Sequence, residues 1–145
     1  MDERAGKVDI ERCLAEGRSV RFPIRGWSMY PLLRDGDEVL VVPADGRELR
    51  RGDVALYRRA GGPLVLHRVC RADASGLCFV GDNQREIEGP LPRGQVRGVM
   101  TAFFRDGNRV DCADRRWRAL AKLWLLARPV RPALAKAVHA LRPRG

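Results

Sequence analysis

The chain has 145 residues, the length of one ordinary domain, and 45% of them are hydrophobic, which is enough to bury a core. A charged fraction of 32% argues against an integral membrane protein. The net charge of +10 is uneven, because residues 113–145 hold nine basic residues and one acidic residue while the rest is nearly neutral. Such a cationic tail suits an anionic surface, either phospholipid or nucleic acid, or serves only as a solvated face.

The first half of the chain predicts one short helix followed by strands. Residues Val8 to Glu16 place apolar side chains on one helical face, and the next residue is a glycine that can end the helix. In residues 19–25 apolar and polar residues alternate, which predicts a half-buried strand with Pro23 marking a sheet edge. Two compact apolar runs, Glu38–Val42 and Asp53–Arg59, predict buried strands.

The next segments predict hairpins. A Gly-Gly turn opens residues 61–72, and a Ser-Gly turn opens the return strand of residues 76–83. Residues 95–110 predict a long strand, or a bent pair around Gly98, with a hairpin turn at residues 106–107. Short strands, tight turns and little helix predict a mostly β domain over residues 1–112, with a coiled or barrel-like antiparallel sheet.

From Asp114 onward the hydrophobic period becomes helical, so residues 113–145 predict a basic amphipathic helical extension. The first apolar face consists of Trp117, Leu120, Ala121 and Trp124. Prolines 129 and 132 break this helix, and a second short face follows at Leu134, Val138 and Leu141. The first helix is too short to span a bilayer, although it could lie on one. We favour packing of its tryptophan face on the β domain or on a partner protein.

Cysteine and histidine usage gives no metal motif. The four cysteines form no CxxC pair and the chain has two histidines, so we expect no metal site and no other cofactor. Cys70 and Cys78 could face each other across a hairpin, and whether they pair stays open. Residues 1–25 contain no apolar stretch long enough for a signal peptide or a membrane span. We therefore expect a cytoplasmic protein, with peripheral contact at the inner membrane face as an open alternative.

Four segments carry the side chains with reactive potential: GWSMYPLL with Ser28, RGDVALY, LHRV with His67, and GDNQREIE with Asp82 and Glu88. A serine hydroxyl needs a neighbouring base to become a nucleophile, and histidine is a natural base because its pKa lies near neutrality. A carboxylate beyond the histidine fixes its tautomer. Taken singly, Ser28 is more typical of a turn and His67 of a polar strand residue, but the set in this order favours a nucleophile site.

These segments resemble the signal peptidase I and LexA-like serine peptidase superfamily over about residues 20–100. GWSMYPLLRDGDEVLV is similar to the nucleophile box of that superfamily, G-x-S-M-x-P-x-L followed by G-D-x-V, and the other three segments match its later boxes in order. Most bacterial members carry a lysine where this chain has His67. The chain therefore resembles the branch found in archaeal and endoplasmic-reticulum signal peptidases, in which histidine replaces lysine.

The resemblance implies a coiled antiparallel β fold and a serine endopeptidase that cleaves a peptide or protein precursor through a Ser28–His67 dyad. Asp82 would orient His67 with Glu88 in support, and the Ser28 backbone N–H would donate to the oxyanion. The substrate would bind as an extended strand. The expected substrate contacts are Gly26, Trp27, Met29, Pro31 and Asn83.

Two other functions stay open from the sequence. A catalytically inactive peptide-binding module would keep the same groove without the chemistry. A regulatory protein could bind nucleic acid through the basic tail, although the tail has no helix-turn-helix pattern and this partner ranks below the others. For residues 114–145 we expect either an anionic membrane surface or a partner protein as the contact.

Overall fold

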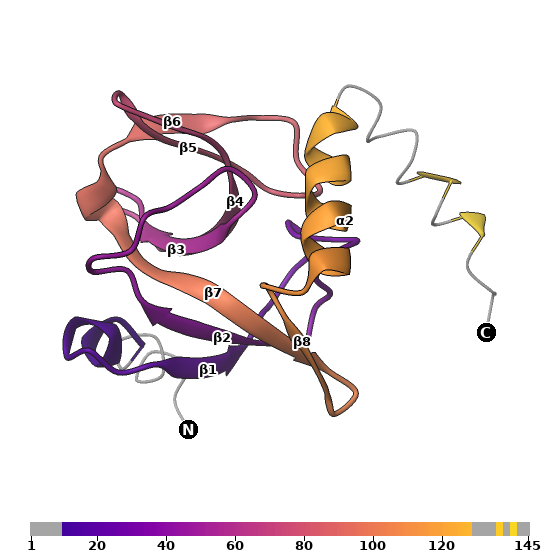
Figure 1. The fold of residues 1–145 in the computed structure, drawn as a ribbon, viewed down its shortest axis with the longest axis horizontal. Helices are drawn as coiled ribbons and strands as arrows, with labels where there is room; N and C mark the ends of the chain where they lie inside the picture. Colours follow the sequence, from indigo (N-terminus) through magenta and orange to yellow (C-terminus); the bar gives the residue numbers. More distant parts are fainter. Residues whose placement is uncertain (1–9, 129–135, 138–139, 142–145) are drawn as a thin grey trace.

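The protein folds around one eight-stranded sheet in which every pairing is antiparallel (Figure 1). The structure, a computed structural model, describes residues 10–128, 136–137 and 140–141. The strands are β1 (Val20–Pro23), β2 (Glu38–Pro43), β3 (Val54–Arg58), β4 (Leu64–Asp73), β5 (Gly76–Val80), β6 (Glu88–Leu91), β7 (Val96–Arg105) and β8 (Asn108–Asp111). Residues 10–15 are helical, a 3-10 turn covers Arg93–Gln95, and helix α2 covers Arg115–Leu126.

The strand order is β1-β2-β7-β3-β4-β5-β6, with β8 paired to β7. The prediction of a mostly β antiparallel fold is confirmed. The sheet does not close into a barrel, since β1 and β6 lie at opposite ends of this order. In Figure 1 the long strand β7 runs between the β1–β2 part of the sheet and the part formed by β3 to β6. Pro23 ends the edge strand β1, as the sequence predicted.

Of the two alternatives predicted for residues 95–110, the structure shows the long strand, because residues 96–105 run continuously through Gly98 and do not form a bent pair. Glycine is needed there because a Cβ would lie 2.4 Å from Val41 Cγ1 and 2.8 Å from the Val42 carbonyl oxygen, where β2 crosses close to β7. Strand β6 was not predicted from the sequence, because its four residues include Gly89 and Pro90, and both residues weaken a strand pattern.

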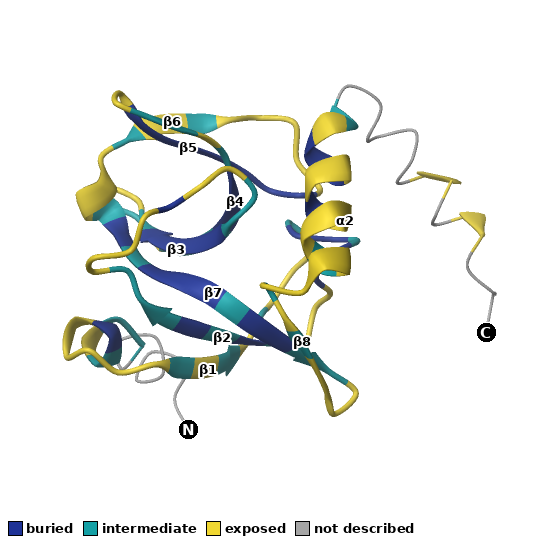
Figure 2. Ribbon diagram, viewed as in Figure 1, coloured by how far each residue is buried: buried dark blue, intermediate teal, exposed yellow. Residues whose placement is uncertain are grey.

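Strand β3 is buried on both faces, which explains its unbroken apolar run. Val54 and Leu56 belong to one hydrophobic cluster, whereas Ala55 and Tyr57 belong to a second. Figure 2 shows β3 and β5 as the most completely buried strands. Because side chains alternate along a strand, each cluster takes every second residue of β3. The face that holds Tyr57 also positions the candidate site.

Helix α2 packs its tryptophans on the β domain, Trp117 on β7 and Trp124 on the segment after β5, as the sequence favoured. Asp114 caps the helix by accepting hydrogen bonds from the Arg116 and Trp117 backbone N–H groups, at 2.9 and 3.2 Å. The Trp117 ring contacts Phe103 with ring centroids 4.7 Å apart. The prediction for Leu120 is wrong, because it is 45% exposed and Leu125 is buried instead. The predicted second face lies largely outside the described residues, as do Pro129 and Pro132.

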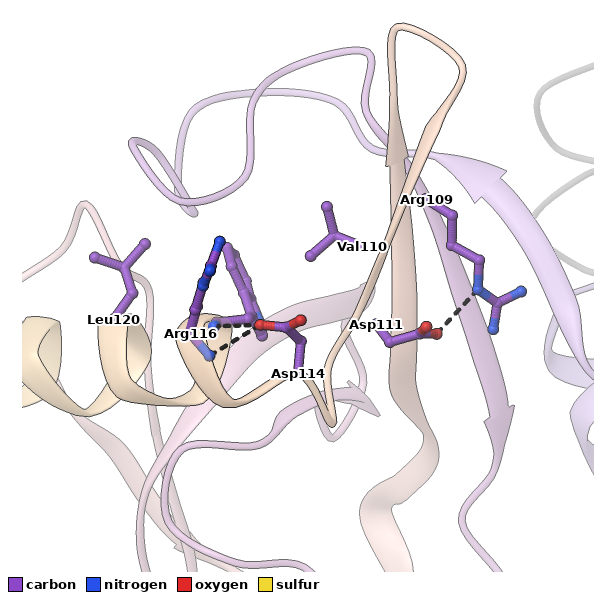
Figure 3. Close-up of a pocket in the computed structure, with 7 residues that line it drawn as sticks. Arg109, Val110, Asp111, Asp114, Arg116 and Leu120 are labelled. Carbon is purple, nitrogen blue, oxygen red and sulfur yellow. Dashed lines mark hydrogen bonds and ion pairs between the residues drawn. The ribbon is translucent and has the colours of Figure 1, made fainter.

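Within the described ranges no helix is both long and apolar enough to cross a membrane. The start of the helix and β8 border a hollow of about 360 Å³ (Figure 3). Both carboxylates that line the hollow already have partners: Asp111 pairs with Arg109 at 2.9 Å, and Asp114 caps the helix. The lining contains no serine, cysteine or histidine: Arg109, Val110, Asp111, Asp114, Arg116, Trp117 and Leu120. The hollow therefore offers no nucleophile.

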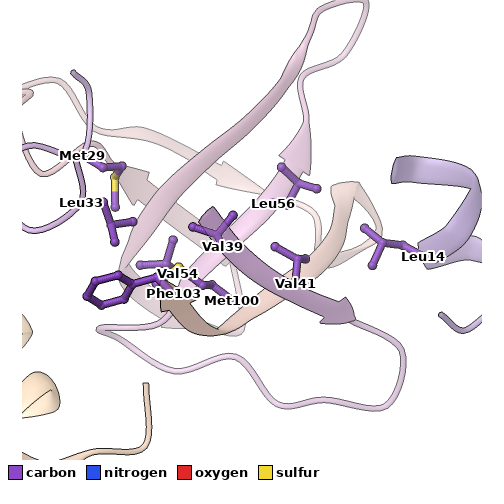
Figure 4. Close-up of a cluster of buried hydrophobic side chains, with 9 residues drawn as sticks. All are labelled: Leu14, Met29, Leu33, Val39, Val41, Val54, Leu56, Met100 and Phe103. Carbon is purple, nitrogen blue, oxygen red and sulfur yellow. The ribbon is translucent and has the colours of Figure 1, made fainter. Parts of the chain in front are cut away.

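One of the two hydrophobic clusters anchors the turn between β1 and β2. Met29 and Leu33 from that turn pack beside Val39 and Val54 of the sheet (Figure 4). Both side chains are almost completely buried, at 3% and 0% exposed. Burying two large apolar side chains contributes on the order of 3–6 kcal/mol, enough to hold a short turn in one conformation. Ser28, which precedes Met29, is thereby fixed to the sheet.

The N-terminal helical segment is joined to the sheet through Glu11. Its carboxylate accepts hydrogen bonds from Arg58 of β3, at 2.6 to 3.1 Å, and from Arg97 of β7 at 3.0 Å. The hydrogen bonds from Arg58 lower the pKa of Glu11 to about 2, against the opposing effect of burial and with the help of Arg97. The lowered pKa means that this carboxylate stabilises the fold above its unfolded pKa of 4.5, and that the contribution is lost as the pH falls through about 2.

We predict that Glu11→Gln lowers the free energy of unfolding by about 1–2 kcal/mol at pH 7, a value reduced for solvent screening of the partly exposed pair. The difference from wild type should shrink as the pH falls from 4.5 towards 2. Urea unfolding at pH 7 and at pH 3, followed by tryptophan fluorescence, measures both. The matched control is Glu16→Gln, whose ion pairs with Arg12 and Arg18 are exposed. Equal effects of the two substitutions would contradict the assignment.

Candidate active site

The strand register brings three polar side chains onto one face of the sheet. His67 of β4 lies opposite Ala55 of β3, so it shares a face with Ala55 and with Tyr57 two residues later. On the same face Val69 lies opposite Phe79 of β5, and Phe79 lies opposite Glu88 of β6. Tyr57, His67 and Glu88 therefore meet across four neighbouring strands.

A chain of hydrogen bonds connects these three side chains. His67 Nδ1 lies 3.3 Å from the Tyr57 hydroxyl oxygen, and the Tyr57 hydroxyl donates to Glu88 Oε1 at 2.6 Å. Arg59 Nε donates to both Glu88 oxygens, at 3.1 and 3.0 Å. The Tyr57 ring is fully buried and stacks on Phe79, with centroids 4.1 Å apart. The packed ring fixes the position of the hydroxyl between base and acid.

The surroundings of His67 favour a neutral imidazole. Burial lowers the pKa of His67 below its ordinary value of 6.5, and the Arg59 cation lowers it further, whereas the negative charges of Glu88 and Asp82 oppose both effects. Burial opposes ionisation of Glu88, but hydrogen bonds from Tyr57 and Arg59 hold its pKa below the ordinary value. Near pH 7 the site therefore combines a neutral imidazole, which can accept a proton, with an ionised carboxylate.

Asp82 lies in a buried ion pair with the residue next to His67. Its two carboxylate oxygens accept hydrogen bonds from Nε and Nη2 of Arg68, both at 2.7 Å, and the two side chains are 0% and 1% exposed. Arg68 also donates to the Gly52 carbonyl oxygen at 2.8 Å, and Trp124 Nε1 donates to the Asp82 carbonyl oxygen at 2.7 Å. The expected orienting role of Asp82 toward His67 stays a prediction, while the side chain bonded to His67 Nδ1 is Tyr57.

Ser28 lies in a turn whose backbone is bonded to the segment after β5. The Ser28 carbonyl oxygen accepts a hydrogen bond from the Asn83 N–H at 2.8 Å. A Cβ at position 81 would lie 2.7 Å from the same oxygen, so this close approach needs a glycine. Val80, the last residue of β5, pairs with Arg68 of β4. The structure thus brings the Ser28 turn to the segment that carries Asp82, which follows β5, the strand next to β4 with His67 and Arg68.

The expected substrate contacts differ in their exposure. Trp27 is 57% exposed and its ring stands edge-on to Tyr30 at 5.6 Å between centroids. Met29 is 3% exposed, so only its backbone could meet a substrate. Gly26 has a φ of +88° and donates its N–H to the Asp35 carboxylate at 2.7 Å. Asn83 is exposed and Pro31 is half-buried, and neither position excludes a substrate contact.

Tyr57, Arg59 and Arg68 were missing from the site predicted by sequence. Tyr57 and Arg68 stand inside the quoted segments RGDVALY and LHRV, and Arg59 follows the first of them. Strand parity could have indicated Tyr57. In two neighbouring antiparallel strands, side chains at paired positions, or at positions two residues apart, lie on the same face of the sheet. The partner of Asp82 had no such signal, because Asp82 follows the end of β5 and has no parity in the sheet.

Other reactive groups are accounted for within the described residues. All four cysteines are free, and Cys70 donates to the Cys78 carbonyl oxygen through its thiol at 3.4 Å. Cys70 lies at a register shift in the β4–β5 pairing, between Val69 and Arg71. No group of three or more potential ligands for a metal ion occurs in the described part of the chain.

Neither protein-family models nor curated proteins match this sequence. The assignment of the site therefore depends on its geometry and chemistry.

We predict that Asp82→Asn lowers the free energy of unfolding by about 3–5 kcal/mol, because it leaves the buried Arg68 guanidinium without a counter-charge. Urea unfolding followed by tryptophan fluorescence measures the loss, and Trp124 reports directly because it binds the Asp82 carbonyl oxygen. Asp111→Asn, which breaks only the exposed pair with Arg109, is the matched control.

Replacing both partners, as Arg68→Met with Asp82→Leu, should recover much of the loss since no unpaired charge is left buried. If Asp82→Asn unfolds like wild type, the ion pair does not stabilise the fold.

Proposed function

We propose that the protein is a serine endopeptidase of the signal peptidase I and LexA-like type, with Ser28 as nucleophile and His67 as general base. The observation that supports this most strongly is the buried imidazole, whose Nδ1 is bonded to Tyr57 beside an ionised Glu88. The hydrogen bond between the Ser28 carbonyl oxygen and the Asn83 N–H places the serine turn beside the segment after β5, and the approach of Ser28 Oγ to His67 Nε2 is part of the proposal. The coiled sheet of that superfamily is consistent with the open antiparallel sheet described above.

In the proposed mechanism, Ser28 Oγ attacks the carbonyl carbon of a peptide bond while His67 Nε2 takes the hydroxyl proton. The imidazolium then returns this proton to the leaving amine, and water attacks the acyl-enzyme with His67 again as base. The backbone N–H of Ser28 donates to the oxyanion. Glu88 stabilises the transient positive charge of His67 through the Tyr57 hydroxyl, which limits the cost of forming a cation in a buried site.

An extended peptide has a suitable place to bind. Strand β1 lies at one end of the sheet and leads into the Ser28 turn, and within the described chain it pairs only with β2. Its free edge can accept a substrate strand through backbone hydrogen bonds. The exposed Trp27 ring lies between this edge and Ser28 in the sequence, where it can cover an apolar substrate side chain.

We predict that a serine-reactive fluorophosphonate labels the wild-type protein and that Ser28→Ala abolishes labelling. His67→Ala should slow labelling by roughly 10²–10⁴-fold, the usual contribution of a general base. Ser75→Ala is the control, because Ser75 lies in the exposed β4–β5 turn. The labelling rate should rise with pH, reach half of its maximum below pH 6.5 and stay level from pH 7 to 8. The reason is that the pKa of His67 is lowered and only the neutral imidazole accepts a proton.

Undiminished labelling of Ser28→Ala would defeat this assignment. No labelling of the wild type, together with retained binding of extended peptides, would favour the inactive peptide-binding module.

Helix α2 supports a second, separate proposal: peripheral contact with an anionic lipid surface, which would place the protein at the inner membrane face. Leu123 and Leu126 are 63% and 68% exposed. Residues 115–128 contain five basic residues and no acidic residue. An exposed apolar ridge within a purely cationic segment fits the boundary between charged headgroups and acyl chains.

We predict that the full chain co-sediments with vesicles of phosphatidylglycerol and phosphatidylcholine but not with vesicles of phosphatidylcholine alone. Leu123→Ser with Leu126→Ser should weaken binding by on the order of tenfold or more, because two exposed leucines lose their burial in lipid. The control is Leu91→Ser, which is half-buried and on β6. Binding to DNA with a steep salt dependence and no vesicle binding would refute the lipid contact and favour nucleic acid.

A further inference from the structure

The hydrogen count at Tyr57 fixes which way each hydrogen bond runs. A phenol has one hydrogen, and an ionised carboxylate can only accept. The 2.6 Å contact between Tyr57 and Glu88 therefore uses the phenol hydrogen. Tyr57 can then only accept in its 3.3 Å contact with His67 Nδ1, so Nδ1 must carry the hydrogen of the neutral imidazole. The remaining ring nitrogen, Nε2, holds the lone pair.

We propose that Tyr57 is a positioning residue that sets the tautomer of His67, in a relay running from the imidazole through a buried phenol to Glu88. The relay performs the task that a carboxylate in direct contact with a histidine performs in serine peptidases. The inference rests on the proposed function for the use of the Nε2 lone pair, but the tautomer itself does not depend on catalysis.

The packing around Tyr57 makes the relay rigid. The ring is 0% exposed and is held against Phe79 at 4.1 Å. A buried hydroxyl needs partners, and here its one hydrogen is directed to Glu88 while its oxygen contacts His67 Nδ1. A phenylalanine at this position would keep the stacking and lose only the relay, which makes the contribution of the hydroxyl measurable.

Arg59 keeps the hydrogen bond between Tyr57 and Glu88 directed from the phenol to the carboxylate. Its guanidinium contacts both Glu88 oxygens and keeps the carboxylate ionised, so Glu88 cannot donate a hydrogen to the phenol and reverse the chain. The charged groups that act on His67 are Arg59 after β3, Glu88 of β6 and Asp82 after β5. Arg68, the neighbour of His67 in β4, is paired with Asp82. Each acid near the imidazole thus has its own arginine.

The test is ¹⁵N NMR of the histidine side chains in the full chain, titrated from pH 4 to 9. His67 and His139 are the two histidines, so His139→Gln assigns the spectrum. In the wild type we expect neutral His67 to carry its ring proton on Nδ1. Tyr57→Phe should lose this preference and become a mixture of tautomers. Glu88→Gln should keep it, because the amide oxygen still accepts the phenol hydrogen, while the pKa of His67 falls with the loss of the negative charge.

Kinetics give a second readout. With a cleavable peptide or the fluorophosphonate probe, Tyr57→Phe should lower kcat, or the labelling rate, by roughly 10- to 100-fold with little change in KM, because a wrong tautomer removes base catalysis and not binding. A merely structural tyrosine would instead change stability and leave the tautomer of His67 as in the wild type.

The outcomes separate the relay from the proposed activity. If neutral His67 of the wild type carries its proton on Nε2, the relay is overturned even if Ser28 is labelled. If the proton lies on Nδ1 and this preference is lost in Tyr57→Phe, the relay is supported even if Ser28 is not labelled. In that case only the peptidase assignment fails. Should Tyr57→Phe fold poorly, the wild-type tautomer and the Glu88→Gln titration still decide.

Discussion

The arrangement of the site depends on the buried pairing of Arg68 with Asp82. Taking both charges out of water is costly, and two 2.7 Å hydrogen bonds, with a third from Arg68 to the Gly52 carbonyl oxygen, offset that cost. The pair joins the turn before β3, strand β4 and the segment after β5. Two further contacts attach to that segment: Trp124 of α2 binds the Asp82 carbonyl oxygen, and the Asn83 N–H binds the Ser28 carbonyl oxygen. One ion pair therefore fixes the relative positions of the helix, the serine turn and the strand that carries the imidazole.

Strand β4 separates this structural role from the chemical one by simple alternation. His67 and Arg68 are neighbours, so their side chains leave opposite faces of the strand. One face meets Tyr57 and the acid of β6, and the other meets the ion pair. A register slip of one residue would exchange the two faces and place the guanidinium against Tyr57. The five matched positions between β3 and β4, with no bulge between them, show how firmly this register is specified.

Most of the sheet could be predicted because its strands carry either clean alternation or unbroken apolar runs. Strand β1 alternates half-buried and exposed residues, and β3 is apolar since both of its faces are covered. Strand β6 could not be predicted, because Gly89 and Pro90 interrupt the strand pattern. As a result, the sequence did not indicate that Glu88 belongs to the sheet. The chemical types of the candidate site came from recognisable segments. The pairing of those groups did not, because Asp82 follows a strand end, where either neighbour, His67 or Arg68, was an equally reasonable partner.

The pairing of each acid with an arginine changes how the imidazole is tuned. A carboxylate in direct contact with a histidine raises its pKa by stabilising the imidazolium. Here Asp82 is bound to Arg68 and Glu88 to Arg59, and the Arg59 cation acts on His67 against the negative charges of both acids. Burial and Arg59 then dominate, and the pKa of His67 falls. The lowered pKa favours a neutral resting base near pH 7, and its orientation then comes from a neutral hydrogen-bond acceptor. The buried hydroxyl of Tyr57, which contacts both the imidazole and Glu88, is the group that meets that requirement.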